Sequence, residues 1–309
     1  MTNLAIIIPY YKLTFLRETL DSLAAQTDQR FKVYIGNDGS HENPEETLKE
    51  FEGRFNFTYK RFEENLGSIS LTKHWDRCIE MIQDEEWFMI LGDDDYLSEN
   101  VVSDFYEHFF SIEEESNVVR YASRIIDANS QNISAIFLQP KLEEAITSYC
   151  RKIKGETRSS LSEYIFRKKS YERCGFKDYF LAWSSDDRVI IDISEFKPIY
   201  SLEALVYVRN SDINISGGNQ NIQSKITARL LATKELMLDY KTKLTLDQHT
   251  ILFGLYEQQF YLKLDPACEH YVFLFAESWK LKGFNYFLYQ VKACLYKALN
   301  VNNKDSILR

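Results

Sequence analysis

The chain has 309 residues, of which 45% are hydrophobic and 27% charged, with 11 glycines and 5 prolines. This composition supports a sizeable core and excludes collagen-like, low-complexity and disordered classes. Asp and Glu number 46 against 37 Lys and Arg, which gives a formal net charge of −9. Because a non-specific nucleic-acid binder needs a basic face, nucleic acid is not an expected partner.

The five cysteines lie far apart and form no C-x-x-C pair. Their spacing argues against both a disulfide framework and a structural zinc site. The N-terminus lacks the basic segment of a signal peptide, and no apolar run approaches the roughly 18 residues of a membrane-spanning helix. These features predict a cytoplasmic protein and leave contact with the inner face of a membrane open.

The first 125 or so residues alternate short apolar, β-rich runs with segments of helical periodicity. Strands are predicted at 4–8, 31–35, 55–62 and 87–91, and helices around 16–24, 44–53 and 69–82. A further helix follows Ser98, which we expect to cap it. Strands that alternate with helices predict βαβ units and an α/β fold with a mostly parallel twisted sheet flanked by helices.

The rest of the chain is less regular and then becomes helical. A strand is predicted at 162–166, a helix after Ser185, and strands near 197–200 and 204–209. From about residue 222 the pattern is helical and aromatic, and the segment 216–219, Ser-Gly-Gly-Asn, interrupts the pattern before it. We therefore predict one α/β domain over residues 1–218 and a helical C-terminal region over 219–309.

Two polar clusters follow predicted buried strands. One is Asn37-Asp38-Gly39-Ser40 and the other is the run 93–95, Asp93, Asp94 and Asp95. Ligands of such sheets bind beyond the carboxyl ends of the strands, so both clusters are candidates for one site. Adjacent aspartates raise one another's pKa, a conflict that Mg²⁺ or Mn²⁺ would relieve; the alternative is a solvated turn. Asp38 could form a plain Asx-turn or bind a base N–H or a ribose hydroxyl.

Four segments in this order resemble the family 2 glycosyltransferases. They are Ile7-Ile8-Pro9-Tyr10-Tyr11, Asn37-Asp38-Gly39-Ser40, Asn65-Leu66-Gly67 and the run 91–95, Leu-Gly-Asp-Asp-Asp. The resemblance is good over about 3–125 and patchy to about 218. It implies the Rossmann-like GT-A fold, with nucleotide-sugar binding at 1–125 and the acceptor side at 126–218. It also implies an inverting transfer of a hexosyl or N-acetylhexosaminyl group from a UDP- or GDP-linked donor to an acceptor hydroxyl, with Mn²⁺ or Mg²⁺.

The resemblance also implies roles for individual residues. The residues implied to bind the nucleotide sugar include Pro9 and Tyr11 at the base, Asp38 at the uracil or guanine edge, Asp93 near the ribose or diphosphate, and Lys73 as a donor contact. Asp94 would ligate the metal with Asp95 alongside. Gly92 stands where the family's D-x-D pattern usually has an aspartate. Arg209 could approach the diphosphate, or it could be a surface arginine on a hairpin.

The segment 183–189 combines a small-residue turn, Asp186 and Asp187, and the start of an apolar helix. From the residues alone, an ordinary acidic helix N-terminus is the simpler interpretation. The resemblance instead places the catalytic base here, with Asp186 favoured and Asp187 as the alternative. A carboxylate is suited to this role because an alcohol is a poor nucleophile at neutral pH.

The tail carries an apolar stripe at helical spacing, formed by Phe284, Phe287, Leu288, Val291, Leu295 and Leu299. From residue 277 to 309 there are six Lys or Arg against two acidic residues, a net charge of +4. The favoured interpretation is a helix packed on its neighbours or on a second subunit. The alternative is peripheral contact with an anionic membrane, where a lipid-linked acceptor would be found.

These features predict a metal-dependent glycosyltransferase of surface polysaccharide or glycoconjugate assembly, with a saccharide or lipid-linked acceptor. A sugar-phosphate nucleotidyltransferase is a second hypothesis. It would need a glycine-rich basic loop after the first strand, whereas Pro9-Tyr10-Tyr11-Lys12 contains no glycine. A nucleotide-sugar-binding module without turnover is the third, and it requires Asp186 and Asp187 to point away from Asp94.

Overall fold

The computed structural model describes residues 3–211 and 221–307, with side chains described up to residue 296. The chain forms two compact units, Met1–Asn221 and Ile222–Arg309. The segment 216–219, on which the sequence placed the interruption between the two regions, lies outside the described residues. Each unit is described by itself below.

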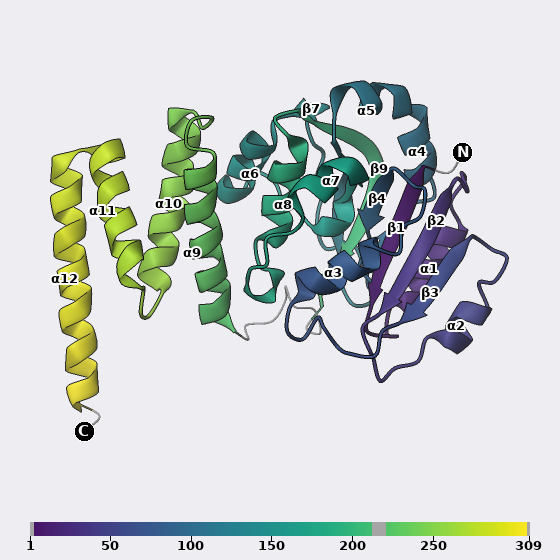
Figure 1. Cartoon of the computed structure of the whole chain (residues 1–309), viewed down its shortest axis with the longest axis horizontal. Helices are drawn as coiled ribbons and strands as arrows, with labels where there is room; N and C mark the ends of the chain where they lie inside the picture. The colour runs from purple at the N-terminus through teal and green to yellow at the C-terminus, as the bar shows by residue number, and fades with distance from the viewer. Residues whose placement is uncertain (1–2, 212–220, 308–309) are drawn as a thin grey trace. The chain divides into compact units, whose positions relative to one another are not determined.

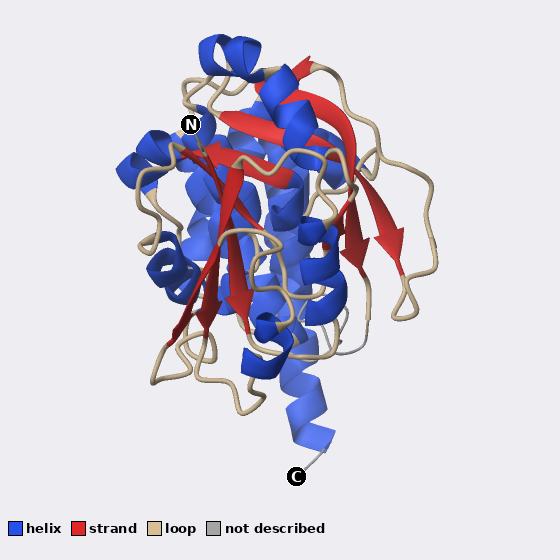
Figure 2. Ribbon diagram, turned by 90° about the vertical axis from the view of Figure 1, so that its right-hand side faces the viewer, coloured by secondary structure: helices blue, strands red, loops and turns tan. Residues whose placement is uncertain are grey.

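In the described part of the first unit, nine strands form one mixed sheet in the order β3-β2-β1-β4-β8-β6-β9-β5, with β7 paired to β9 (Figure 1). The strands are β1 (Leu4–Tyr10), β2 (Phe31–Asn37), β3 (Phe57–Arg61), β4 (Trp87–Ile90), β5 (Tyr96–Leu97), β6 (Val118–Ile126), β7 (Leu142–Glu143), β8 (Tyr164–Arg167) and β9 (Ile199–Arg209). Strands β3, β2, β1 and β4 run parallel, as do β6 and β9, while β8 is antiparallel to both β4 and β6. The predicted α/β sheet is therefore present, and Figure 2 shows its twist.

Helices cover both faces of this sheet. They are α1 (Leu16–Ala24), α2 (Glu45–Lys49), α3 (Leu71–Ile79), α4 (Val101–Glu107), α5 (Phe109–Glu115), α6 (Ala145–Lys154), α7 (Lys168–Cys174) and α8 (Ser185–Ser194), with two short 3₁₀ helices, η1 (Leu161–Glu163) and η2 (Phe180–Ala182). Residues 4–8 of β1 are 0% exposed. A continuous apolar run is what a strand covered on both sides requires. Helices α1, α2, α4 and α5 share one core with β1, and α3 contacts β1 and β2.

Three local predictions are wrong. Ser98 does not cap the following helix, because its hydroxyl donates to Asn100 Oδ1 and the N-cap of α4 is Asn100. The helix predicted from there is two helices, divided at His108. The strands predicted near 197–200 and 204–209 are one strand, β9, and its parallel neighbour β6 was not predicted.

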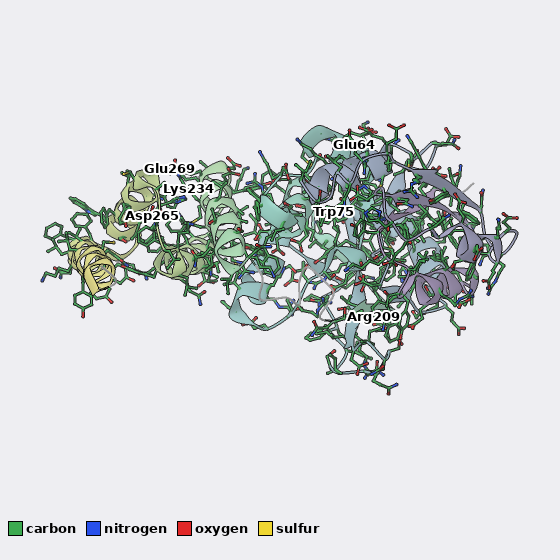
Figure 3. The ribbon with its side chains drawn as sticks, turned by 90° about the horizontal axis from the view of Figure 1, so that it is seen from below. Glu64, Trp75, Arg209, Lys234, Asp265 and Glu269 are labelled. Carbon is green, nitrogen blue, oxygen red and sulfur yellow. The ribbon has the colours of Figure 1, made fainter. Side chains whose placement is uncertain are left out.

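The described part of the second unit consists of four helices, α9 (Ile222–Asp239), α10 (Leu246–Leu262), α11 (Cys268–Lys282) and α12 (Phe284–Ile307). Thr245 and Gln248 form a capping box that begins α10. Nζ of Lys234 on α9 lies 3.1 Å from Oε2 of Glu269 on α11, and Figure 3 labels both residues. None of the described helices combines the length and the apolarity that crossing a membrane requires.

The apolar stripe of the tail is only partly as predicted. Phe284, Leu288 and Leu295 are 54%, 40% and 60% exposed, whereas the ring of Phe287 packs against Phe275 and Trp279 on α11. Helix α12 also buries Gln290 and Cys294, and Gln290 accepts a hydrogen bond from Tyr261 on α10. The face turned toward the other helices of this unit therefore combines part of the stripe with polar contacts. The side chain of Leu299 lies outside those described.

Candidate functional site

The two predicted polar clusters lie at the same edge of the sheet. Strand β1 pairs with β2 and β4, and all three run parallel, so their carboxyl ends meet there. The amide of Asp38 donates to the carbonyl of Tyr10, and the amide of Leu91 donates to that of Ile7. The chain therefore leaves β2 at Asp38 and β4 at the aspartate run beside the end of β1.

Asp93 ties the aspartate run to the end of β1. Its Oδ2 accepts hydrogen bonds from the amides of Tyr11 and Lys12, at 2.8 and 2.9 Å. Burial raises the pKa of Asp93, and these two amides oppose that rise. Tyr11 is 39% exposed and its hydroxyl accepts from Asn65, while Pro9 lies half-buried in β1. An exposed aromatic ring thus stands between the two clusters.

Asp38 is buried, and both of its carboxylate oxygens are used by the protein. Oδ1 accepts from the amide of Leu66 and Oδ2 from the amide of Gly67, each at 2.9 Å. Arg77 on α3 also donates to Oδ1. Burial raises the pKa of Asp38, and the two amides and Arg77 oppose it. Asp38 therefore shapes the loop 65–67 at this edge of the sheet.

Arg77, rather than Lys73, is the cation of α3 that reaches Asp38. Lys73 is exposed on the same helix. Arg77 lies over the ring of Phe62, 4.0 Å from its centroid, and its Nε donates to His74 Nδ1. Burial and the charge of Arg77 lower the pKa of His74 to about 3. His74 is therefore neutral, although its Nδ1 lies 3.3 Å from Asp38 Oδ1.

Asp94 and Asp95 turn their carboxylates toward one point. A Cβ added at Gly92 would lie 2.7 Å from Asp94 Oδ1 and 3.3 Å from Asp95 Oδ2. Burial and the charge of Asp93 raise the pKa of Asp94 to about 6, and burial and Asp94 raise the pKa of Asp95 to about 7. The space above Gly92 is therefore bordered by two carboxylates that destabilise one another. An aspartate at this position, as in the family pattern, would fill that space.

Arg209, labelled in Figure 3, is 2% exposed, so the alternative of a surface arginine is wrong. Its guanidinium donates to the carbonyls of Asp94 and Asp127 and to the side chains of Glu18 and Ser130, and lies 4.1 Å from the centroid of the Phe15 ring. Its backbone amide donates to Asp95 Oδ1 at 2.8 Å. It ends β9 and fixes the main chain of the aspartate run.

The carboxylates of Asp94 and Asp95 are suitable ligands for a hard divalent cation. Two converging carboxylates with raised pKa values are what such an ion stabilises, and Mg²⁺ in particular is often held by one or two carboxylates together with substrate phosphates. In the described part of the chain, no group of three or more His, Cys, Asp or Glu side chains is arranged to hold a metal ion. An ion held by these two carboxylates would need a phosphate ligand and water to complete its coordination.

Asp186 and Asp187 lie in the first turn of α8, after a loop with unusual backbone geometry. Leu181, Ala182 and Ser184 all have positive φ, at 59°, 53° and 74°. Such conformations cost energy in non-glycine residues and occur often at functional sites. Burial and the neighbouring Asp187 raise the pKa of Asp186 to about 6.

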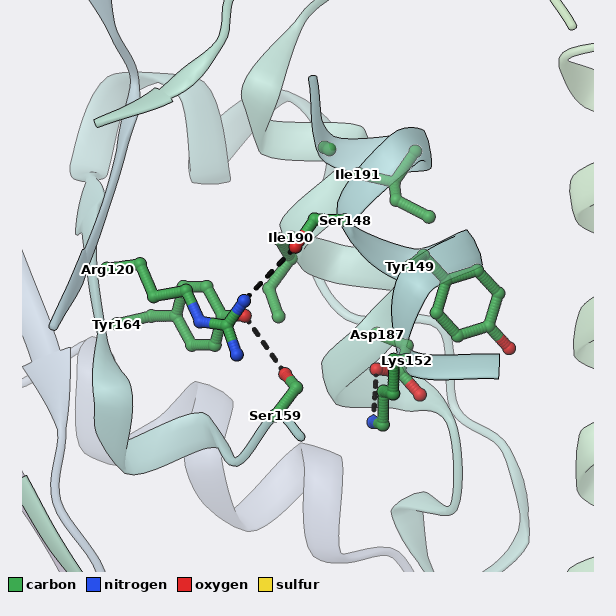
Figure 4. Close-up of a pocket in the computed structure, with 10 residues that line it drawn as sticks. Arg120, Ser148, Tyr149, Lys152, Ser159, Tyr164, Asp187, Ile190 and Ile191 are labelled. Atoms are coloured by element: carbon green, nitrogen blue, oxygen red, sulfur yellow. Dashed lines mark hydrogen bonds and ion pairs between the residues drawn. The ribbon is translucent and has the colours of Figure 1, made fainter. Parts of the chain in front are cut away.

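Asp187 has an ion-pair partner of its own on another element. No hydrogen bond or ion pair between this carboxylate pair and the aspartate run is found among the residues that the structure describes. Asp187 pairs instead with Lys152 on α6, at 2.5 Å. This pair borders a small cavity of about 10 Å³, also lined by Arg120, Ser148 and Tyr164 (Figure 4).

Sequence reasoning missed Arg77 and Lys152. Arg77 lies four residues after Lys73, so helical spacing could have nominated it as a second cation on α3. Lys152 carries no such signal, because its partner is 35 residues away in the chain. Both were missed because their roles depend on contacts between elements.

Comparison with known proteins agrees with this architecture. The profile of glycosyl transferase family 2 matches residues 5–174. Among solved structures, residues 1–349 of S. aureus TarS in complex with UDP-GlcNAc superpose with a TM-score of 0.64 and 16% identity, over 90% of this chain and 80% of that one. The complex of S. aureus TarS 1–349 with UDP superposes with a TM-score of 0.58 and 15% identity, over 84% of this chain and 70% of that one. The longer S. aureus TarS chain gives 0.61 and 15%, over 87% of this chain and 46% of that one. No curated protein matches.

The structural matches confirm the predicted GT-A fold, and the family profile covers more than half of the chain. The parallel strands β2, β3 and β4, nearly all of β1, the loops at their carboxyl ends and the aspartate run fall within the matched residues. The chain belongs to glycosyl transferase family 2 and is a glycosyltransferase.

Proposed function

We propose that this glycosyltransferase moves a sugar from a nucleoside diphosphate donor to an acceptor hydroxyl, with inversion and with a divalent cation. The observation that carries the proposal is the convergence of the Asp94 and Asp95 carboxylates above Gly92, beside the exposed ring of Tyr11. Two anionic groups there would repel a diphosphate unless a cation joined them. The formal charge of −9 on the whole chain would also repel an anionic diphosphate, so a bound cation would favour its binding.

The nucleoside would lie between the ends of β1 and β2. Tyr11 offers an exposed ring for the base, with Pro9 beneath it in β1. Asp38 would act at the base edge together with the loop 65–67 that it holds. Asp93 orients the Tyr11 and Lys12 amides, and Lys73 stays a proposed donor contact on α3. UDP-linked donors are the first to test, because TarS was solved with UDP-GlcNAc and with UDP.

Asp94 and Asp95 would hold the cation, Mn²⁺ or Mg²⁺. When bound, such an ion neutralises the charge that develops on the leaving diphosphate. Arg209 would act indirectly, because its guanidinium is engaged with the Asp94 carbonyl and with other protein groups. It fixes the backbone from which the Asp94 carboxylate projects.

Asp186 or Asp187 would take the proton of the acceptor hydroxyl. A positioned carboxylate contributes about 10²–10⁴-fold to such a reaction, and it works best with a pKa near the working pH. The raised pKa of Asp186, about 6, meets that requirement. The nucleotide-sugar side at 1–125 and the acceptor side at 126–218 would then supply one carboxylate cluster each.

For the acceptor we propose a saccharide or a lipid-linked saccharide of surface polysaccharide or glycoconjugate assembly. The exposed apolar side chains of α12, with the lysines of α11 and α12, would suit either self-association or peripheral contact with an anionic membrane from the cytoplasmic side. Vesicle co-sedimentation distinguishes the two, because self-association does not require lipid.

A thermal-shift panel of UDP-, GDP-, CMP- and dTDP-sugars, each with and without Mn²⁺, tests the donor proposal. A ligand at 100 times its dissociation constant stabilises the folded state by about 2.7 kcal/mol. We expect a UDP-sugar to raise the melting temperature in the presence of Mn²⁺. The absence of a shift with every nucleotide would contradict the proposal.

A further inference from the structure

The side chain of Asp178 links the segment between α7 and α8 to helix α3. Its Oδ1 accepts hydrogen bonds from the hydroxyls of Ser70 and Thr72, at 2.8 and 2.7 Å. The two hydroxyl-bearing residues are 7% and 1% exposed, whereas Asp178 itself is exposed. Hydrogen bonds to a carboxylate are stronger than those between neutral groups. Asp178 therefore joins two elements that are more than a hundred residues apart in the chain.

The backbone that follows Asp178 is strained. Leu181, Ala182 and Ser184 have φ values of 59°, 53° and 74°. In the same segment, Phe180 is 57% exposed, so this conformation does not bury its ring. Left-handed conformations cost energy in non-glycine residues and persist only where the surrounding structure holds them. The segment 179–184 therefore depends on the contacts that fix its two ends.

The contacts at the two ends differ in what they reach. The hydroxyl of Ser185, at the start of α8, donates to the carbonyl of Lys177 at 2.6 Å. The amide of Ala182 donates to the carbonyl of Tyr179 at 2.8 Å. Both bonds close the segment on itself and on α8. Asp178 adds hydrogen bonds to a different element, α3, and these oppose relaxation of the strained backbone.

Helix α3 extends the link to the nucleotide side of the sheet. The amide of Ser70 donates to the carbonyl of Leu66 at 2.8 Å. Asp38 holds the loop 65–67 through the amides of Leu66 and Gly67, and it also accepts from Arg77 on α3. These contacts do not involve Asp178. Removal of its carboxylate should therefore free the strained segment and leave the loop 65–67 in place.

We propose that Asp178 is a positioning residue that holds the strained segment 179–184 against α3 and so keeps the acceptor side in register with the nucleotide side. The inference rests on the proposed function, in which residues 126–218 form the acceptor side. Asp178 acts through the backbone that it holds and not through contact with a substrate. Turnover should consequently depend on Asp178, whereas nucleotide affinity should not.

The first test uses the full chain with Mn²⁺ and UDP-GlcNAc, and measures UDP release with water in place of the acceptor. Asp178→Ala should lower kcat by about 10–10²-fold, because small misplacements of a positioned group have effects of this size. The dissociation constant of UDP, measured by calorimetric titration, should stay unchanged. Asp178→Asn keeps an oxygen that accepts from both hydroxyls and should restore kcat.

The second test measures the segment directly, by hydrogen exchange of the amides of 179–184. Exchange should be faster in Asp178→Ala and as in the wild type in Asp178→Asn. Thr72→Val removes one of the two hydroxyls and should change exchange and kcat in the same direction by less. The effect of Asp178→Ala should be smaller in the Thr72→Val background, because the two residues act together. If Asp178→Ala does not fold, Thr72→Val carries the same test.

Two control variants separate positioning from general packing. Tyr171→Phe removes a hydrogen bond from α7 to Asp76, on the same helix α3. It should lower the melting temperature and leave kcat unchanged, because it does not hold the strained segment. Asp84→Ala, at an exposed position, should change neither.

Three results would overturn the inference. They are an unchanged kcat in Asp178→Ala, a loss of kcat matched by an equal loss of UDP affinity, and an equal loss of kcat in Tyr171→Phe. If the wild-type chain neither binds UDP-GlcNAc nor releases UDP from it, the proposed function fails. Hydrogen exchange then decides the inference alone, and unchanged exchange of 179–184 in Asp178→Ala would refute it.

Discussion

Asp38 and Arg209 are buried charged residues whose side chains hold backbone at the edge of the site. Asp38 accepts from two amides of the loop 65–67, and Arg209 donates to the carbonyls of Asp94 and Asp127. Buried charges are tolerated when they are paired and hydrogen-bonded. The position of Asp38 after a strand could be predicted from the sequence. The partners of Arg209 could not, because Glu18 is 191 residues away in the chain.

Arg209→Lys should destabilise the fold by about 1–3 kcal/mol, because an ammonium group cannot reproduce the fork that donates to four groups. It should also weaken Mn²⁺-dependent donor binding, since Asp94 loses its backbone support. Urea unfolding measures the first effect and calorimetric titration the second. Arg17→Lys, at an exposed pair with Glu50, is the control and should change stability by less than about 0.5 kcal/mol. Equal stability of the two variants would contradict the account.

Helix α3 and the loop before it show how closely the elements approach one another. A Cβ at Gly67 would lie 2.5 Å from Asp38 Oδ2, and a Cβ at Gly36 on β2 would collide with Cys78 Sγ on α3. The sequence indicates the strands and helices by their apolar periodicity. It does not indicate which glycines are needed for close approach, because that depends on how β2 and α3 pack.

Gly67→Ala should lower the free energy of unfolding by about 1–3 kcal/mol, because Asp38 must move away from the amides that donate hydrogen bonds to it. UDP binding should weaken with it. Gly254→Ala on α10 has open space around the added Cβ and should be neutral or stabilising by about 1 kcal/mol. Thermal melting and calorimetric titration with UDP measure both variants. Wild-type stability and UDP affinity in Gly67→Ala would show that Asp38 does not constrain the loop.

The buried imidazole of His74 on α3 should make the fold sensitive to acid. Its folded pKa of about 3 lies below the value of about 6.5 in an unfolded chain, so the unfolded state binds more protons between these values. The contribution of neutral His74 to the free energy of unfolding is therefore fully present above about pH 6.5. Below that value it decreases by up to about 1.4 kcal/mol per pH unit as the pH falls.

The stability difference between the wild type and His74→Gln should accordingly shrink as the pH falls from 6.5 to 4, measured by urea unfolding. Contributions of groups that do not contact His74 cancel in this difference. His41→Gln, at an exposed position, should follow the wild-type pH dependence. A stability difference between the wild type and His74→Gln that does not vary with pH would show that His74 is not held neutral.

At the scale of the whole molecule, the chain carries a net negative charge and belongs to a family of glycosyltransferases. Its run of three aspartates follows β4, at the edge of the sheet where the parallel strands end. The α/β order and the aspartate run could be predicted because they are local in sequence. The position of β6 in the sheet and the burial of Gln290 on α12 could not, because the first depends on long-range strand pairing and the second on a hydrogen bond from another helix.

The central claim is that Asp94 and Asp95 bind a divalent cation that receives the diphosphate of the donor. Calorimetric titration of the full chain with UDP-GlcNAc, with Mn²⁺ and with a chelator, tests it most directly. We expect at least about tenfold tighter binding with Mn²⁺, equivalent to about 1.4 kcal/mol. This gain should be absent in Asp94→Asn and present in the exposed control Glu99→Gln. Equal affinity with and without Mn²⁺, or a full gain in Asp94→Asn, would contradict the claim.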